Sequence, residues 1–170
     1  MSDEIAGKIH WCGKQKKGIK LTEPNENLCT AYIRKAETSL KSMHLNHQAK
    51  IYDWAVDAAY YARYQAFYGL LQKCGISCEI HDCSIMLLRF LFADIFDEAF
   101  FRELENAKDQ RINLVYYTNR IVPQEEIEKN IASASGFVLK MEEFTSKINS
   151  ENIQVLQQQL KKGLEERSKK

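Results

Sequence analysis

Four residue types that can hold a metal ion lie within ten residues of one another in the middle of the chain: Cys74, Cys78, His81 and Cys83. Their spacing is Cys-x3-Cys-x2-His-x-Cys, whereas a structural zinc site usually combines two separated pairs of ligands. A single short turn between helices would have to supply all four side chains here. Cysteine also packs as a small apolar residue in protein cores. We therefore interpret the cluster as packing and predict neither a metal site nor a cofactor.

The sequence carries none of the common motifs of nucleophilic, phosphate-binding or zinc-hydrolase chemistry. G-x-S-x-G, the P-loop, G-x-G-x-x-G and H-E-x-x-H are all absent from the printed sequence. The four histidines are His10, His44, His47 and His81, and none sits in a nucleophile motif. These patterns assign no catalytic residue.

Arg111 has the most informative position of any single residue. It lies seven residues after Leu104, which places its guanidinium on the inward stripe of a predicted helix. A buried charge is costly unless it is paired, so two interpretations stay open. One is a structural salt bridge to an acid on another helix, or an arginine that reaches out to water. The other is an anion site, since the planar guanidinium suits phosphate, with Asn113, Tyr116 and Tyr117 as neighbours.

A run of aromatic residues dominates the segment before these cysteines. It consists of Tyr60, Tyr61, Tyr64, Phe67 and Tyr68. Their helical spacing indicates a core or a dimer interface first. A role in stacking nucleic-acid bases would need exposed rings beside positive charge. Arg63 is the candidate for that charge, unless its side chain simply points outward.

Composition excludes several classes of protein. The 170 residues include 24 Lys and Arg against 23 Asp and Glu, and the net charge of +1 excludes nucleic-acid binding by bulk positive charge. Seven glycines and two prolines are too few for the turns of an all-β or Rossmann fold. No apolar run approaches a membrane span, and the first residues lack the apolar region of a signal peptide. Five cysteines predict no disulfide framework, and we expect a cytoplasmic protein.

Hydrophobic periodicity predicts an all-α, up-down antiparallel bundle of four to six helices. We expect one domain with three parts: a basic arm at 1–24, irregular or with a short strand, a bundle at 25–149, and a peripheral amphipathic helix at 150–170. Asp97 and Pro123 are typical of helix starts, and Gly75 of a helix end. The predicted helices are 25–46, 48–73, 80–93, 97–119, 123–148 and one after 150.

The middle of the chain resembles the HEPN domain family. The carrying residues are Ala59-Tyr60-Tyr61-Ala62, Ala66, Leu70-Leu71, Gly75 and His81, followed by Arg111-Ile-Asn-Leu-Val-Tyr116 where the family places its Arg motif. The resemblance covers roughly residues 28–148. It implies a helical bundle that is usually a homodimer, and many prokaryotic members pair with a minimal nucleotidyltransferase in toxin–antitoxin systems. Catalytic members are metal-independent ribonucleases with an Arg and a His separated by four to six residues; others bind nucleotides or RNA.

This chain departs from that motif, because no histidine stands five to seven places after any arginine. Tyr116, Tyr117 and Thr118 occupy the positions after Arg111, and tyrosine, with an ordinary pKa of about 10, is a poor proton shuttle. We therefore expect a non-catalytic dimeric module that binds RNA, a nucleotide or a partner nucleotidyltransferase. Three alternatives stay open. The chain is an atypical ribonuclease that uses Arg111, Asn113 and Tyr116, or it is a purely structural interaction protein. The third alternative is adenylylation of Tyr116 or Tyr117.

The expected site residues fall into two groups. The candidate RNA or nucleotide contacts are Arg111, Asn113, Tyr116, Tyr117 and Arg63. The candidate core or dimer aromatics are Tyr60, Tyr61, Tyr64 and Tyr68.

Overall fold

The computed structural model describes residues 3–117 and 121–165 of the chain. The described residues form seven helices and one two-stranded ribbon: α1 (Asp3–Lys14), β1 (Lys20–Leu21), α2 (Glu26–Gln48), α3 (Tyr52–Lys73), β2 (Ile76–Ser77), α4 (His81–Phe92), α5 (Glu98–Tyr116), α6 (Gln124–Lys147) and α7 (Ser150–Glu165). The all-α fold class is confirmed. The helix count exceeds four to six because α1 forms in the arm, where only an irregular segment or a short strand was expected.

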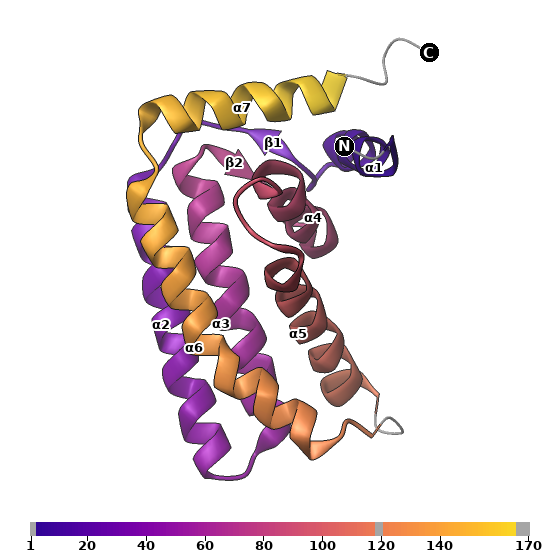
Figure 1. Ribbon diagram of the computed structural model, residues 1–170, viewed down its shortest axis with the longest axis vertical. Helices are drawn as coiled ribbons and strands as arrows, with labels where there is room; N and C mark the ends of the chain where they lie inside the picture. Colours follow the sequence, from indigo (N-terminus) through magenta and orange to yellow (C-terminus); the bar gives the residue numbers. More distant parts are fainter. Residues whose placement is uncertain (1–2, 118–120, 166–170) are drawn as a thin grey trace.

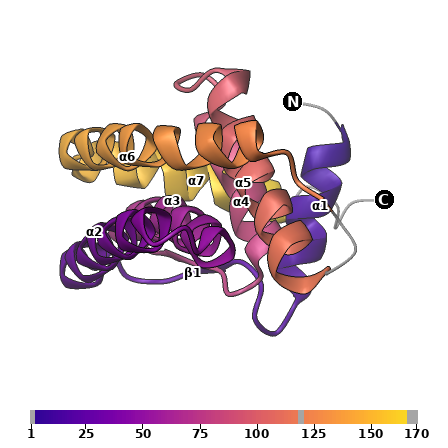
Figure 2. The ribbon, with the colours of Figure 1, turned by 90° about the horizontal axis from the view of Figure 1, so that it is seen from below.

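Helix α3 lies at the centre of the bundle and packs against α2, α5 and α6. In Figure 1 the long helices α2, α3 and α6 run side by side, α5 lies beside them, and α7 crosses their upper end. Viewed from below in Figure 2, α2 and α6 lie on different sides of α3. Because α5 also packs on α3, a side chain that leaves α5 inward meets the central helix.

The ends of the helices follow local chemistry that the sequence predicts. The side chain of Asn25 accepts a hydrogen bond from Leu28 N at the start of α2, and Asp97 accepts one from Phe100 N at the start of α5. Gly75 follows α3 with a φ of 66°, a left-handed conformation that favours glycine. The chain then turns into β2, which pairs antiparallel with β1. The last predicted residues of the fourth helix, 118–119, lie outside the described residues, as do 166–170.

The tyrosine run is core within a single protomer. Tyr60, Tyr64 and Tyr68 are buried, and their rings stack along α3 with centroids 5.8 Å and 5.7 Å apart. Tyr61 is half-buried at the surface of the same helix. The first interpretation of these rings, as a core, is therefore correct for three of them, and their place in a dimer stays a prediction.

A disulfide bond joins Cys12 of α1 to Cys83 of α4. The odd cysteine count did not predict this pair, since the two residues are 71 positions apart and meet only because α1 packs on α4. Cys29, Cys74 and Cys78 are buried thiols, and burial raises the pKa of Cys74 to about 12. Within residues 3–117 and 121–165, no group of three Cys, His, Asp or Glu residues is placed to hold a metal ion.

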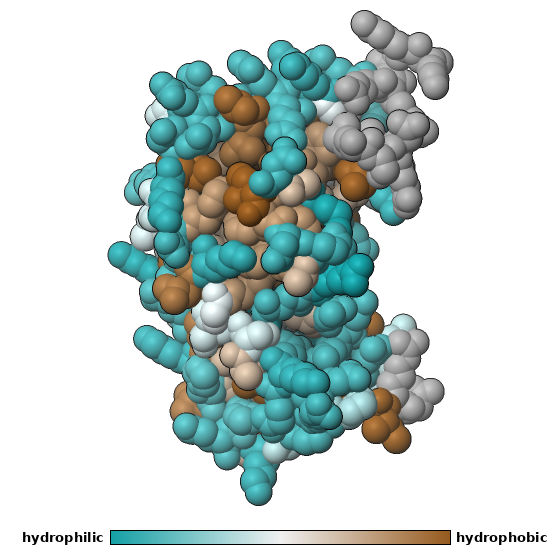
Figure 3. All heavy atoms as spheres, in the orientation of Figure 1, coloured by the Kyte–Doolittle hydropathy of each residue, from teal (hydrophilic) through white to brown (hydrophobic). Residues whose placement is uncertain are grey.

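The face shown in Figure 3 is mostly hydrophilic, with an apolar area in its upper half. Elsewhere large apolar side chains such as Trp54 and Leu45 are exposed near the turn between α2 and α3. In the part of the chain that the structure describes, no helix has both the length and the hydropathy needed to span a membrane.

Arg63 fastens α3 to both α5 and α6. Its side chain is fully buried, so it does not point outward. Nε donates to Glu103 Oε1 at 3.0 Å, Nη1 donates to Ala59 O, and Nη2 donates to Asn130 O and Ser133 Oγ at 2.6 Å and 2.8 Å. Burial lowers the pKa of Arg63, and the charge of Glu103 opposes that shift. One guanidinium thus links three helices of the bundle.

Removing the charge of Glu103 should destabilise the fold far more than removing a surface charge nearby. Glu103→Gln leaves the buried Arg63 without a counter-charge, and we expect a loss of about 3 kcal/mol in the free energy of unfolding. The matched control Glu105→Gln removes a surface partner of Arg89 and should cost less than about 1 kcal/mol. Urea titration followed by circular dichroism measures both. Equal losses would contradict the role assigned to Arg63.

Candidate functional site

Arg111 reaches inward from α5 and meets an acid on α3. Its side chain is 14% exposed, and Nε donates to Asp57 Oδ1 at 2.6 Å. Nη2 donates to the hydroxyls of Tyr61 and Tyr116 at 3.2 Å and 3.1 Å. The inward position predicted from the heptad-like spacing is therefore confirmed, and the salt bridge to another helix is present.

Aromatic rings surround the Arg111 guanidinium. Its Cζ lies 4.9 Å from the ring centroid of Tyr61 and 5.4 Å from those of Tyr60 and Tyr116, within the range of cation–π attraction. Burial alone would lower the pKa of Arg111, but the hydrogen bond to Asp57 and the phenol of Tyr61 outweigh burial and raise it. Arg111 is therefore a fixed positive charge in an aromatic setting.

His81, the first residue of α4, lies against the same group of aromatic rings. Its ring stacks on Tyr64 with centroids 4.1 Å apart and planes 10° apart, and it stands at 90° to Tyr61 at 6.4 Å. Its Nδ1 lies 2.6 Å from the hydroxyl of Tyr60. Tyr60 and Tyr61 thus contact both His81 and Arg111. We call the set Asp57, Tyr60, Tyr61, His81, Arg111 and Tyr116 the Arg111–His81 cluster.

The hydroxyl of Tyr60 fixes which nitrogen of His81 carries a proton. Burial raises the pKa of Tyr60 above its ordinary value, so the phenol keeps its hydrogen. The phenol is fully buried and has no other hydrogen-bond partner among the described residues, so it must donate to His81 Nδ1. An Nδ1 that accepts carries no proton in the neutral ring, and the hydrogen therefore sits on Nε2.

Two donor atoms of the cluster are left for a ligand. Arg111 Nη1 and His81 Nε2 donate to no described residue. In residues 3–117 and 121–165, the buried polar side-chain atoms without a partner are Asn130 Oδ1 and Thr145 Oγ1, so neither of these nitrogens is sealed inside the protein. Burial lowers the pKa of His81, and the positive charge of Arg111 lowers it further. The negative charge of Asp82 raises the same pKa but does not cancel the decrease. The imidazole is therefore a neutral donor beside a cation.

The other predicted contacts lie in different places. Tyr116 belongs to the cluster and is 61% exposed, while Tyr117 caps the end of α5 and is 44% exposed. Asn113 lines a groove between α5 and α6, away from Asp57. Arg63 lies in the wall of that same groove, with its donors bound to protein groups. The structure therefore brings Tyr116 to Arg111 and keeps Asn113 and Arg63 apart from it.

Sequence reasoning missed that His81 contacts the same tyrosines as Arg111. The search for a histidine followed the spacing along one helix, whereas His81 is 30 residues earlier, on a separate helix. Both residues reach the tyrosines of α3, and α5 packs on both α3 and α4. The resemblance to the family included His81 without giving it this role, and no spacing in the chain encodes the contact.

The ion pair between Arg111 and Asp57 predicts a mutant cycle. Arg111→Met leaves the 19% exposed Asp57 carboxylate without its partner, so we expect a loss of about 2 kcal/mol in the free energy of unfolding. Adding Asp57→Asn should recover most of that loss, because the unpaired charge is then gone. Urea denaturation of the wild type, both single variants and the double variant measures the coupling. Additive losses would show that the two side chains do not stabilise each other.

Comparison with known families places the cluster inside a matched domain. A search of the curated proteins finds no match to the chain. A family model, the HEPN domain, matches residues 30–144, which is more than half of the chain. The matched segment contains α3, α4 and α5, the three helices that build the Arg111–His81 cluster. On the extent of that match, the chain belongs to the HEPN domain family.

Proposed function

We propose that this chain is a non-catalytic HEPN module that binds the phosphate of an RNA or a nucleotide at the Arg111–His81 cluster. Family membership supports a nucleotide- or RNA-related role at the coarse level. The observation that carries the finer proposal is the pair of donors, Arg111 Nη1 and His81 Nε2, that no described protein group uses. A guanidinium and an imidazole N–H are both good donors to phosphate oxygens.

The rings around Arg111 supply the second half of a nucleotide site. Tyr116 is 61% exposed, and its hydroxyl already bonds Arg111, so a base could stack on its open face while the phosphate meets the guanidinium. Tyr117 adds exposed aromatic surface next to it. Stacking tolerates any base, so this arrangement favours RNA or nucleotide binding without strong sequence preference.

The state of His81 argues against catalysis. Metal-free RNA cleavage needs a base to take a proton from the attacking hydroxyl. Nε2 of His81 already carries a hydrogen, and Nδ1 is occupied by the hydroxyl of Tyr60. Tyr60 is buried with a raised pKa, so it does not release its proton at neutral pH. The cluster is thus built to donate hydrogen bonds.

A second candidate function is an atypical ribonuclease, and one observation favours it. An arginine and a histidine do contact the same tyrosines in this chain, although they lie on α5 and α4 in place of one helix. Arg111 could stabilise charge on the phosphorane without a metal ion. Cleavage would require the proton of His81 to move from Nε2 to Nδ1. That change would break the hydrogen bond that the Tyr60 hydroxyl donates to Nδ1.

We propose further that the working form is a homodimer, since HEPN domains commonly dimerise. The same proposal includes a partner, a minimal nucleotidyltransferase that forms a toxin–antitoxin pair with this chain. That partner would adenylylate the exposed Tyr116 or Tyr117. The proposal also includes a cytoplasmic location. The exposure of both tyrosines supports the acceptor role. Light scattering of the purified chain measures the mass that tests the dimer.

The state of His81 is directly measurable. We expect imidazole nitrogen NMR spectra to show a neutral ring with the hydrogen on Nε2, and a titration midpoint below the ordinary histidine value. Arg111→Met should raise the pKa of His81, because a positive charge that disfavours the imidazolium is removed. A hydrogen on Nδ1, or an unchanged pKa in the variant, would contradict the cluster described here.

Binding should depend on the same donors. We expect fluorescence anisotropy with a short labelled RNA to show at least a tenfold weaker affinity for Arg111→Ala and roughly a threefold weaker one for His81→Ala. The matched control Arg102→Ala removes an exposed arginine of the same helix and should change affinity less than twofold. Equal affinity of wild type and Arg111→Ala, or no binding at all, would remove this function.

Incubation of RNA with EDTA-treated protein separates the two functions. Intact RNA with the wild type supports binding alone. Cleavage that persists in EDTA and disappears in His81→Ala would establish the ribonuclease instead. Tyr116→Phe controls for a contaminating nuclease, since contaminant activity would be the same in every preparation.

A further inference from the structure

The N-terminal segment of the chain lies outside the family match but is bonded covalently to the helix that begins with His81. The matched segment starts at residue 30, so α1 and β1 precede it. Cys12 of α1 nevertheless forms a disulfide with Cys83, which lies two residues after His81 in the first turn of α4. Residues 3–21, which we call the N-terminal clamp, are therefore attached directly beside a donor of the proposed phosphate site.

A second set of contacts joins the N-terminal clamp to the segment that precedes His81. The side chain of Lys17 pairs with Glu79 at 3.0 Å, and the Lys17 carbonyl accepts a hydrogen bond from Glu79 N at 2.9 Å. β1 pairs with β2, with Lys20 opposite Ser77. Helix α1 packs on α4 and α7, and Figure 1 shows it beside α4 at the end of the bundle that α7 crosses. The backbone of His81 is thus held from both sides, before and after it in sequence.

Hydrogen bonds connect the turn that contains Cys83 to the ring of His81. Ser84, the next residue, donates its hydroxyl to the carbonyl of His81 at 2.9 Å. That bond uses the one hydrogen of Ser84 Oγ, so the Tyr64 hydroxyl is the donor in its 3.1 Å bond to Ser84 Oγ. Tyr64 is the ring on which His81 stacks. A shift of this turn therefore displaces His81 against both Tyr64 and the hydroxyl of Tyr60.

The start of α4 lacks the local restraint that two other helices have. Asn25 and Asp97 cap α2 and α5 with side-chain hydrogen bonds, whereas Ile80 at the N-cap position of α4 provides none. An uncapped start frays readily, because the first N–H groups of a helix have no partner within it. The bond from Cys83 to α1 supplies a covalent restraint at the same turn.

We propose that the N-terminal clamp is a positioning element of the phosphate site: the Cys12–Cys83 bond fixes the first turn of α4 and thereby holds the Nε2 donor of His81 in place. The inference rests on the function proposed above for the ligand, whereas the setting of His81 is measurable without one. Cys12 and Cys83 are both buried, so they act through His81 as positioning residues.

Imidazole nitrogen NMR tests the clamp in the absence of RNA. Burial and the charges of Arg111 and Lys108 lower the pKa of His81, while Asp82 opposes that shift. In Cys12→Ser the ring should leave these surroundings. We therefore expect its pKa to rise toward the ordinary histidine value, with loss of the preference for a hydrogen on Nε2.

Cys78→Ser is the matched control for this comparison. It replaces a buried cysteine three residues before His81 that has a free thiol and no bond to the N-terminal clamp. The His81 spectrum of this variant should equal that of the wild type. An equal rise in the His81 pKa in Cys78→Ser and Cys12→Ser would overturn the proposal.

RNA affinity gives a readout that a bond with a purely structural role would not change. Cys12→Ser should weaken binding of a short labelled RNA roughly threefold, the loss expected for His81→Ala. In the double variant the serine should add no further loss, because the clamp acts through His81 alone. Additive losses would overturn the proposal. Failure of the wild type to bind RNA would contradict the proposed function alone, and the NMR comparison would then decide the clamp.

The presence of the bond is checked by alkylation of the unfolded chain, purified without reductant. Three cysteines should react, namely Cys29, Cys74 and Cys78. Alkylation of all five would overturn the proposal, because the clamp would then have no covalent attachment to α4.

A second bond-free form avoids any substitution. Wild type is reduced in urea with a phosphine, which takes up the oxygen of water while the bond becomes two thiols, and is refolded in the same reductant. Circular dichroism should show the helix content of the wild type, and NMR should show the His81 spectrum of Cys12→Ser. Unfolding of both bond-free forms would make the bond a staple of the whole fold and overturn the proposal. An unchanged His81 pKa in either form would do the same.

Discussion

The buried guanidinium of Arg63 is the interaction on which the arrangement of the bundle depends. It ties the central helix α3 to a carboxylate on α5 and to a carbonyl and a hydroxyl on α6. Taking one such charge out of water is costly, and only the full set of partners makes it tolerable. Any displacement of α5 or α6 would leave part of that set unpaired. This single constraint therefore holds α5 at a defined depth and rotation against α3.

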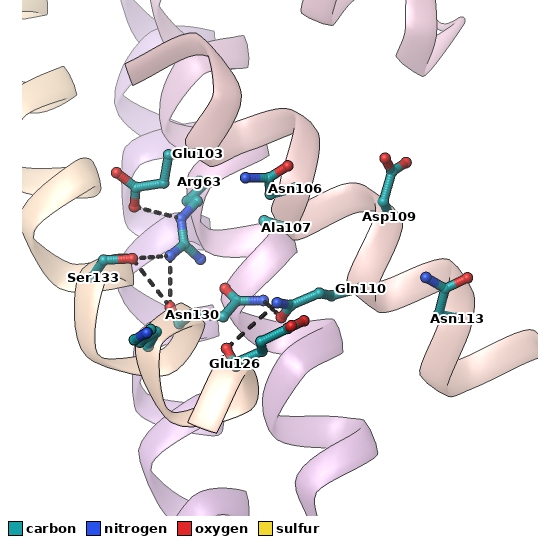
Figure 4. A pocket seen from close by; sticks show the side chains of 11 residues that line it. Arg63, Glu103, Asn106, Ala107, Asp109, Gln110, Asn113, Glu126, Asn130 and Ser133 are labelled. Atoms are coloured by element: carbon teal, nitrogen blue, oxygen red, sulfur yellow. Dashed lines mark hydrogen bonds and ion pairs between the residues drawn. The ribbon is translucent and has the colours of Figure 1, made fainter. Parts of the chain in front are cut away.

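The rotation of α5 decides what each of its faces can do. With Glu103 directed to Arg63, Arg111 is directed to Asp57 and the tyrosines of α3, while Gln110 is directed to α6. One helix thus separates two polar regions of different character. The cluster toward α3 and α4 offers a fixed cation and a neutral imidazole donor. The groove toward α6 is lined by side chains of both charges, among them the paired Arg63 and Glu103 (Figure 4).

The Tyr60 hydroxyl shows how a core residue can set the chemistry of a surface site. Its only described partner is His81 Nδ1, and a buried hydroxyl has to be satisfied. The core requirement therefore selects the histidine tautomer, and the tautomer decides whether Nε2 gives or takes a proton. An arginine and a histidine that contact the same tyrosines would otherwise suggest acid–base catalysis. Here the phenol makes hydrogen-bond donation the better-supported role.

The sequence by itself determined the helical class, most helix boundaries and the inward position of Arg111. These features are local: caps such as Asn25 and Asp97, the stop at Gly75 and the apolar period act within a few residues. It also supported membership of the HEPN family. The helix α1 was not expected, because its formation depends on packing against α4 and α7.

Only the tertiary structure decided which distant side chains meet. Three features join different helices across 20 to 71 positions of sequence: the contacts of His81 with Tyr60 and Tyr61, the ion pair of the buried Arg63, and the Cys12–Cys83 bond. No period or spacing specifies such contacts, since they depend on how whole helices rotate and pack. The physical reason is that a side chain's pairing and desolvation are properties of its three-dimensional surroundings, whereas helix propensity and capping are properties of its neighbours in the chain.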